Sequence, residues 1–520
     1  MEDKKYLIDP IKPFSESLIW QINRDYYQQA GIDAWRKGIV PHNLTSNAMV
    51  GKTYAELVFA FLKDLAVKGH KEETVYILEV GAGHGRLAFH ILKHLERLVG
   101  HVGLELPKYC YVLSDIVEEN LNFFLDHTQF QTYFEKGILD VAYFDAIEGK
   151  ELELRYSKKS ILPQSLNQPL LVLANYFFDS LPMDLFYFKD KEIFTCSISL
   201  ESSENPEGKE TTALLEKLEM AYFNLPLEKP CYKNSILNEI IEEYRELVFN
   251  TYLFFPTKGF QCIHNLRQLS QKGLCLISMD KGFHEIHDLE NSKFPEMVTH
   301  GSFSFWVNYH ALDAYCKKNE GKAMFPEYST FHLDLGCLMF LPEPETYYET
   351  KIAYEHFVND FGPDDNNSIK QFAYRNIAKM NLTEIIAWLR LSGYDSTLFK
   401  NILPIIKHLA RKISVNERTR LGQTMHRIWD GYFTLDEEFD MAFEIGGMMY
   451  ALGYYKDALK YFAFSVTQFG EKADIFYNQA LCHYHLREDN LFLKTVKEAK
   501  VAFPNYENYK QLDKLDLSAS

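Results

Sequence analysis

Three glycines and one acid that follow a short apolar run are the residues best placed to bind a ligand. The run Val75–Val80 contains Glu79 and leads into a turn with glycine at alternate positions, after which apolar residues recur at helical spacing. These glycines are Gly81, Gly83 and Gly85. Glycines between a strand and a helix allow the backbone to approach a ligand closely, so the segment predicts a cofactor-binding turn.

The spacing of the glycines and the position of the acid distinguish between two classes of cofactor. A dinucleotide site requires G-x-G-x-x-G, but Arg86 stands where the last glycine would be. The carboxylate of Glu79 would repel a pyrophosphate, whereas it would attract the ammonium or sulfonium of S-adenosylmethionine (SAM). The segment therefore resembles motif I of the class I SAM-dependent methyltransferases. A glycine turn without a ligand is the alternative.

Two further acids stand at the ends of predicted strands. The run 110–114 ends in Asp115, which could accept both ribose hydroxyls or cap the helix that follows. The run 137–145 ends in Asp145, at the place where this fold usually meets the adenine amino group. Asp140 is the competing candidate for that role.

The most distinctive motif follows the apolar run 170–174. It places Asn175, two phenylalanines, Asp179 and Pro182 at the carboxyl end of a strand, where open α/β sheets bind ligands. This N-x-F-F-D-x-L-P run resembles a motif of the MidA-like family, which includes the mitochondrial complex I assembly arginine methyltransferase.

Other segments between about residues 40 and 340 support the same resemblance. They are Thr45-Ser46, Tyr54 with Glu56, Ser278-Met-Asp280-Lys-Gly282, and the polar-aromatic stretch from His300 to His310. The chain departs from the family at Ala82, His84 and Tyr176, where the family has Pro, Arg and Glu. Because carboxylates hold a guanidinium best, the tyrosine leaves arginine as one option among side-chain nitrogens.

The resemblance implies a SAM-dependent methyltransferase that modifies a side-chain nitrogen, possibly that of arginine, in a protein or peptide. The expected cofactor-binding residues are Glu79, Gly81, Gly83, Gly85, Asp115 and Asp145. The expected catalytic residues are Asn175, which would orient the acceptor through its amide carbonyl, Asp179, which would hold a cation or cap a turn, and His310 as a general base. The expected substrate pocket comprises Glu56, Tyr176, Phe177, Phe178 and His300, and either histidine could instead be structural.

The elements that position these residues form an α/β class fold, a Rossmann-like seven-strand-type methyltransferase core over residues 71–345. Its strands are expected at 75–80, 110–114, 170–174 and 274–279, with a Glu-rich surface insertion at about 200–255. Residues 1–70 predict an N-terminal helical cap. Residues 346–375, which contain FGPDDNNS, predict a linker.

Residues 376–512 predict an all-α helical repeat domain. Small and aromatic residues recur at a period of about 34 residues, as in tetratricopeptide repeats, with two plausible units over 439–506. The residues that fit this pattern are Gly446, Ala458, Phe462, Ser465, Ala480 and Ala499. Such repeats would offer a concave surface that recruits the protein or peptide substrate, whereas an ordinary helical bundle is the alternative.

Composition narrows the remaining classes of function. The net charge of −17 over 520 residues argues against nucleic-acid binding, which needs clustered Lys and Arg. The eight cysteines form no CxxC pair, and no cluster has metal-ligand spacing, so no metal is expected. The absence of a signal peptide and of a membrane-length apolar run predicts a cytoplasmic protein without a membrane partner. A non-catalytic SAM-binding or repeat scaffold and a small-molecule methyltransferase are the alternatives.

Overall fold

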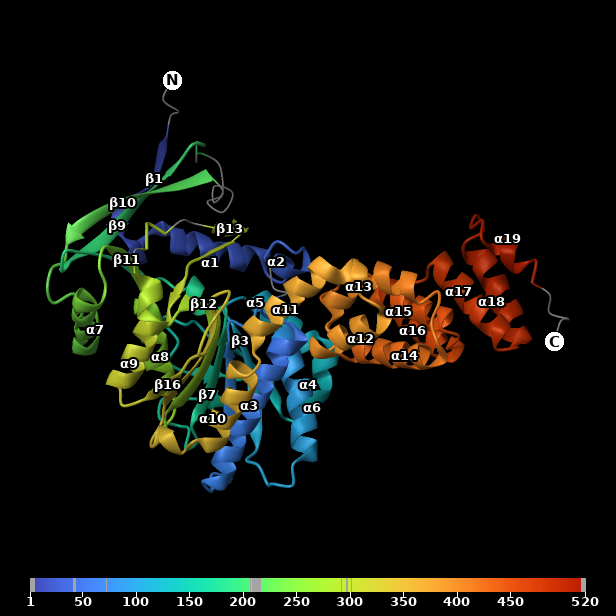
Figure 1. The fold of residues 1–520 in the computed structure, drawn as a ribbon, viewed down its shortest axis with the longest axis horizontal. Coiled ribbons are helices and arrows are strands. Elements are labelled where there is room, and N and C mark those ends of the chain that lie inside the picture. Colours follow the sequence, from blue (N-terminus) through green and yellow to red (C-terminus); the bar gives the residue numbers. More distant parts are fainter. Residues whose placement is uncertain are drawn as a thin grey trace. The chain divides into compact units, whose positions relative to one another are not determined.

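The computed structural model describes residues 5–40, 44–71, 73–205, 207, 217–290, 292–295, 298–300 and 302–515 (Figure 1). The chain separates into two compact units, Met1–Ile369 and Lys370–Ser520. The N-terminal unit mixes helices and strands, and the C-terminal unit is helical over its described residues. Each unit has hydrophobic core clusters of its own.

The N-terminal unit is built on a mixed sheet whose main path has the strand order β16-β17-β12-β7-β2-β3-β4. Neighbouring strands from β4 to β12 run parallel, and β17 runs antiparallel to both of its neighbours. The carboxyl ends of the parallel strands therefore meet at one edge of the sheet. The bounds are β2 Val75–Val80, β3 Tyr109–Asp115, β4 Leu139–Tyr143, β7 Leu170–Asn175, β12 Leu274–Phe283, β16 Lys322–Met324 and β17 Leu333–Phe340, and β15 (Val307–Asn308) pairs with the end of β12.

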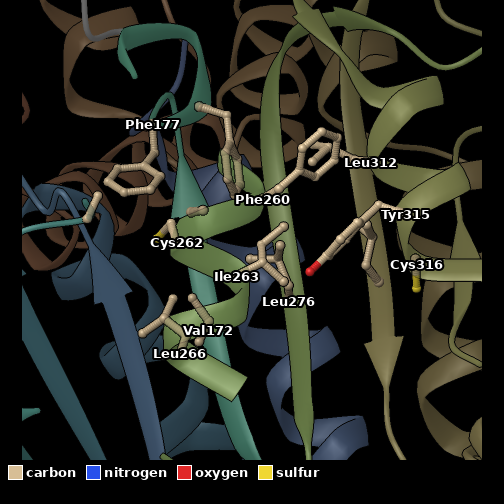
Figure 2. Packing of buried hydrophobic residues seen from close by; sticks show 14 of the residues in the cluster. Val172, Phe177, Phe260, Cys262, Ile263, Leu266, Leu276, Leu312, Tyr315 and Cys316 are labelled. Atoms are coloured by element: carbon tan, nitrogen blue, oxygen red, sulfur yellow. The ribbon is translucent and has the colours of Figure 1, made fainter. Parts of the chain in front are cut away.

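The central strands are buried on both faces, which explains why their sequences are continuously apolar rather than alternating. One face is covered by α8 (Thr257–Arg267), with α9 (Tyr309–Lys318) beside it. Figure 2 shows the side chains of Ile263 and Leu266 on α8 lying close to Val172 of β7. Each such side chain stabilises the fold by about 1.5–3 kcal/mol when fully buried. Elsewhere in the unit, α3 (Ala48–Val67) packs along α4 (Arg86–His101).

The region predicted as an N-terminal helical cap also contains a strand. Helices α1 (Leu18–Ala30), α2 (Asp33–Arg36) and α3 are present, but β1 (Tyr6–Pro13) precedes them and pairs antiparallel with β9 (Glu192–Ser202). The prolines and charged residues of β1 are untypical of a strand, so the sequence does not predict one there. They are tolerated because β1 is an edge strand with two register shifts.

A second, five-stranded sheet contains β1 and takes in part of the predicted surface insertion. Its other strands are β8 (Asp184–Lys189), β9, β10 (Leu218–Pro226) and β11 (Thr251–Phe255), and α7 (Ser235–Leu247) lies between the last two in sequence. The described residues of the 200–255 segment therefore belong largely to regular structure rather than to an irregular surface loop.

The segment predicted as a linker is mostly helical. It contains α10 (Tyr348–Tyr354), a π-helical turn (Glu355–Asn359) and α11 (Pro363–Asn376), and the boundary between the units falls inside α11. Proline in the first turn and acids beside it favour a helix start, and the Gly362 N–H donates to Asp365 Oδ2 at 2.9 Å. Proline and aspartate, which are common in loops, here form the first turn of α11.

The C-terminal unit consists of consecutive short helices. They are α12 (Leu382–Leu391), α13 (Ser396–Leu409), α14 (Val415–Asp430), α15 (Met441–Ala451), α16 (Tyr455–Phe469), α17 (Ala473–His485), α18 (Asp489–Ala502) and α19 (Tyr509–Leu512). Helix α15 packs on α16, and a Cβ atom at Gly446 would lie only 2.8 Å from the ring of Phe462. The small residues Ala480 and Ala499 are also buried, on the paired helices α17 and α18. These positions suit helix pairs in close contact, and the tetratricopeptide interpretation stays a prediction.

Candidate functional site

The carboxyl ends of β2, β3, β4 and β7 open into a cavity of about 410 Å³, within the roughly 300–1,000 Å³ typical of ligand pockets. Most of the residues predicted to act on a ligand line this one cavity. They are Glu79, Gly81, Gly83, Asp115, Asp145, Asn175, Tyr176 and Asp179. Segments up to a hundred residues apart are thus brought together by the parallel strands.

The glycine turn between β2 and α4 requires glycine on two counts. Gly81 and Gly83 have φ values of +65° and +59°, which favour glycine. A Cβ atom on Gly81 would lie 2.9 Å from the ring of Phe177, and one on Gly83 would lie 2.9 Å from the ring of Trp35. Gly85 lies outside the cavity wall and precedes the first residue of α4. The turn therefore forms the floor of the cavity with its first two glycines.

Glu79 is a buried acid at the end of β2. Its side chain lines the cavity, and Oε2 accepts a hydrogen bond of 2.7 Å from the hydroxyl of Tyr111. Burial raises the pKa of Glu79 to about 8, although the Tyr111 bond opposes the shift. A cationic ligand in the cavity would favour the ionised carboxylate.

Asp115 connects the glycine turn to the next loop. Its Oδ2 accepts from the Gly83 N–H at 2.9 Å, and its Oδ1 accepts from the Val117 N–H at 2.9 Å, just before α5 (Glu118–Asp126). Burial raises the pKa of Asp115 to about 6, and these N–H groups limit the rise. Each carboxylate oxygen can accept a second hydrogen bond, so support of the loop and ligand binding are compatible.

Asp145 lines the cavity after β4 and forms an ion pair with Arg24 of α1, with 2.6 Å between Oδ2 and the guanidinium. Burial raises its pKa, but the Arg24 ion pair and the N–H of Ile147 outweigh burial, so the net shift is downward. The competing candidate Asp140 lies outside the cavity and accepts the N–H groups of Tyr156 at 2.8 Å and of Ser157 at 3.0 Å. The position therefore favours Asp145.

The opposite wall comes from helices that the sequence does not connect with the site and from part of the polar-aromatic stretch 300–310, which it does. It is formed mainly by α1, α2 and β14 (Ser302–Ser304), and the hydroxyl of Tyr27 donates to Ser302 Oγ at 3.0 Å. The contributing residues are Trp20, Asn23, Arg24, Tyr27, Trp35, Ser302, Phe303 and Ser304. Their spacing on α1 is that of an ordinary amphipathic helix, so the sequence carries no signal that distinguishes this helix from core packing.

The end of β7 supplies the third part of the cavity. The Asn175 amide donates through Nδ2 to the Thr45 carbonyl at 3.2 Å, and its Oδ1 lies 3.5 Å from the Tyr54 hydroxyl. Tyr176 follows with φ of +52°. Burial raises the pKa of Asp179 to about 7, whereas a hydrogen bond with Ser304 and the charge of Lys281 lower it. A carboxyl group beside an amide is thus available to a polar ligand atom.

Besides Gly85, three predicted site residues lie outside the cavity. Phe178 packs in the core, where its ring lies 3.0 Å from the position of a Cβ atom on Gly259, and Phe177 lines the cavity instead. Glu56 is bonded to His94 at 2.9 Å between α3 and α4. His310 is the second residue of α9, and its Nδ1 meets the Tyr244 hydroxyl of α7 at 2.8 Å.

These positions correct the corresponding predictions, because each residue lies on a helix or a helical turn that directs its side chain away from the cavity. His300 lies on β13 (Val298–His300), and its side chain is outside the described residues. No group of three or more His, Cys, Asp or Glu side chains in the described part of the chain is arranged to hold a metal ion. The described helices include none that is long and apolar enough to cross a bilayer.

Comparison with known proteins gives a match to one protein family. A family described as "Putative S-adenosyl-L-methionine-dependent methyltransferase" matches residues 55–291, which include β2, β3, β4, β7 and most of the cavity residues. No curated protein gave a match. The match and the intact cavity residues make this chain a methyltransferase whose cofactor is SAM.

Solved structures of two Burkholderia thailandensis proteins show slight similarity. One, described as a "COG1565 superfamily member and likely methyl transferase" bound to S-adenosyl-homocysteine, is 13% identical and covers 61% of this chain and 74% of that chain with a TM-score of 0.38. The other, an O-methyltransferase family protein, is 8% identical and covers 65% and 64% with a TM-score of 0.27. Similarity this slight supports no conclusion about fold or acceptor.

Proposed function

We propose that this SAM-dependent methyltransferase methylates a side-chain nitrogen of a protein or peptide, which the C-terminal helical repeats recruit. The observation that carries the proposal is that Asn175 and Asp179 line the same cavity as Glu79 and Asp115. The cavity thus contains groups suited to the cofactor and groups suited to an acceptor nitrogen. The resemblance of the N-x-F-F-D-x-L-P run to the MidA-like family supports a nitrogen acceptor.

The residues of the cavity fit SAM. Glu79 would hold the methionine ammonium, Asp115 would hold the ribose hydroxyls, and Asp145 would lie at the adenine. Apolar side chains next to these acids would contact the adenine ring; they are Ile116, Val117, Phe144 and Ala146. The strand order, with one antiparallel strand near the edge, supports the seven-strand methyltransferase fold that the sequence predicts.

Methyl transfer mainly requires that the acceptor be oriented and shielded from water. Bound SAM supplies the methyl group on a sulfonium. Asn175 is placed to accept an N–H of the acceptor through its amide carbonyl, because Thr45 already fixes the amide nitrogen. The acceptor nitrogen loses a proton as it gains the methyl group, and Asp179, with a pKa of about 7, is a suitable proton acceptor at neutral pH.

Asp179 has no second carboxylate beside it from the same motif, because Tyr176 occupies that position. A guanidinium would therefore be held by one carboxylate and one amide carbonyl, whereas a lysine amine needs no bidentate fork. We infer that the site accepts a side-chain nitrogen, with arginine and lysine as the two candidates that experiment must separate.

The test uses the full chain with tritiated SAM and two randomised peptide libraries, one with arginine fixed at the centre and one with lysine. We expect label in one library, and we expect Asn175→Ala to abolish most of it while SAM binding is retained. Label in neither library, with transfer to low-molecular-weight metabolites instead, would replace the proposal with a small-molecule methyltransferase. Tight SAM binding without any transfer would favour the scaffold alternative.

A further inference from the structure

The motif Ser278-Met-Asp280-Lys-Gly282 on β12 contains an acid that the proposed chemistry does not use. The side chain of Asp280 has no exposed surface. An ionised group in such a position is costly unless hydrogen bonds compensate, so its contacts indicate why an acid stands there.

Asp280 lies where β7 leaves the sheet. The ladder between β7 and β12 pairs Asn175 with Met279, and the Tyr176 N–H still donates to the Met279 carbonyl at 2.8 Å. Tyr176 then adopts φ of +52°, which turns the chain away from β12. A tyrosine rarely adopts this left-handed conformation, so the surrounding structure must hold the turn in place.

After this turn, the side chain of Asp280 accepts the backbone hydrogen bonds that the strand ladder no longer provides. Its Oδ2 accepts the N–H of Phe177 at 3.3 Å and the N–H of Phe178 at 3.2 Å. Both phenylalanines are buried, so without Asp280 these two backbone donors would lose their partner in the interior of the protein. The next residue is Asp179, and the residue before the turn is Asn175.

Gly282, two residues after Asp280 in the same motif, is required for packing. A Cβ atom on Gly282 would lie 2.4 Å from the Val307 carbonyl oxygen and 2.7 Å from the ring of Tyr309. Glycine therefore lets β15 and α9 pack against β12 two residues beyond Asp280. Both residues of the motif thus have structural roles beside the site: Asp280 binds the turn after β7, and Gly282 allows close packing on β12.

The other oxygen of Asp280, Oδ1, has no hydrogen-bond partner among the described residues. Burial and the charge of Asp179 raise the pKa of Asp280 well above its usual range. An uncharged side chain with an acceptor at the Oδ2 position should therefore replace it well, and asparagine is such a side chain.

We propose that Asp280 is a positioning residue of the methyl-transfer site: its carboxyl oxygen holds the N–H groups of Phe177 and Phe178 and thereby fixes the turn that presents Asn175 and Asp179 to the acceptor. The consequence for catalysis rests on the proposed function of Asn175 and Asp179. The anchoring of the turn does not depend on it.

The experiment compares Asp280→Asn, Asp280→Ala and Asp280→Glu in the full chain. Asparagine keeps an acceptor oxygen without the titratable group, whereas glutamate keeps the carboxyl group but displaces the acceptor by one carbon. We expect Asp280→Ala and Asp280→Glu to lower the turnover number on the labelled peptide library by about 10- to 100-fold, since misplacement by about 1 Å can have that effect. Asp280→Asn should remain within about threefold of the unmodified chain, and the affinity for S-adenosyl-homocysteine should change little in all three.

Hydrogen–deuterium exchange of the segment 175–181 supplies a readout that needs no acceptor. Its amides should exchange faster in Asp280→Ala and Asp280→Glu, and at the original rate in Asp280→Asn. Asp334→Ala is the matched control, because Asp334 is an equally buried acid directly opposite Asp280 on β17 that bonds to His284 and not to the turn. It should leave the exchange of this segment and the turnover unchanged.

Several outcomes would overturn the proposal. Unchanged exchange in Asp280→Ala, or an equal loss of turnover in Asp280→Asn and Asp280→Ala with the turn still protected, would show that Asp280 does not act through these two hydrogen bonds. If neither peptide library is methylated by the unmodified chain, the proposed function fails, and the exchange data still decide whether Asp280 anchors the turn. If Asp280→Ala does not fold, the contrast between asparagine and glutamate decides it.

Discussion

The cavity residues assigned to the cofactor and those assigned to the acceptor, called here the cofactor end and the acceptor end, differ in how the chain builds them. The cofactor end is made by short segments in which a strand leads directly into the turn that carries the ligand groups, as at Glu79 and Gly81. The acceptor end depends on Asn175 and Asp179, whose positions are held by distant residues such as Thr45 and Asp280. Long-range contacts hold the cofactor end as well, such as that between Tyr111 and Glu79, but they are different contacts, so substitutions should affect the two ends separately.

The largest loss of SAM affinity should come from removing both acids of the cofactor end. We expect Glu79→Ala with Asp115→Ala to weaken SAM binding by at least about 100-fold, because two charge-assisted contacts of about 1.5–3 kcal/mol each are lost. Calorimetric titration with SAM measures the effect. Asp140→Asn is the control, since Asp140 is a buried acid outside the cavity. Retained binding in the double variant would place the cofactor elsewhere.

At the acceptor end, Asn175→Ala should lower turnover by about 10- to 100-fold and change SAM affinity by less than about twofold, because the amide orients the acceptor only. Single-turnover rates and SAM titration on the same preparation separate the two quantities. A parallel loss of both would mean that the two ends are not separable.

The pH dependence of cofactor binding sharpens the assignment of Glu79. Its pKa is about 8 because of burial, so below pH 8 a proton must leave before the carboxylate can pair with a cation. Affinity for SAM should therefore rise by up to about tenfold per pH unit between pH 6 and 8 and level off above. Calorimetry in buffers of different ionisation enthalpy detects the released proton, and Glu79→Gln should release none.

The smallest effect should come from the glycine turn. Gly83→Ala meets both an unfavourable φ and the ring of Trp35, whereas Gly137→Ala has a similar φ of +68° with no atom within 4 Å of its Cβ position. Both should lose about 1 kcal/mol of stability in chemical denaturation, but only Gly83→Ala should also weaken SAM binding, by a few fold. Equal SAM affinity in the two variants would show that the turn tolerates a methyl group beside Trp35.

The parts of the site that could be predicted are those in which one short segment contains both the strand and the ligand groups. Val75–Val80 is a strand with the bounds expected, and Asp115 and Asp145 follow their strands into the cavity. The apolar runs were sufficient because parallel strands covered on both faces leave little ambiguity in sequence.

The part of the wall formed by α1 could not be predicted, because its contacts join residues such as Tyr27 and Ser302 that are far apart in the chain. His310 was misplaced for the same reason: its neighbour in space is Tyr244, on another helix. Proline followed by acids is typical both of a loop and of the start of a helix, so the sequence alone does not distinguish a linker from the helix that begins at Pro363. Local patterns name a residue's possible roles, and tertiary contacts select one of them.

The pairing of β1 with β9 has a consequence for synthesis on the ribosome. Tyr6 pairs with Ser202, roughly two hundred residues later, so at about 5–20 residues per second the first strand waits on the order of 10–40 s for its partner. During that time an unpaired apolar strand would be an aggregation hazard. The two prolines and the charges of Asp9 and Lys12 interrupt its edge, as gatekeeper residues do, and they protect the nascent chain until β9 emerges.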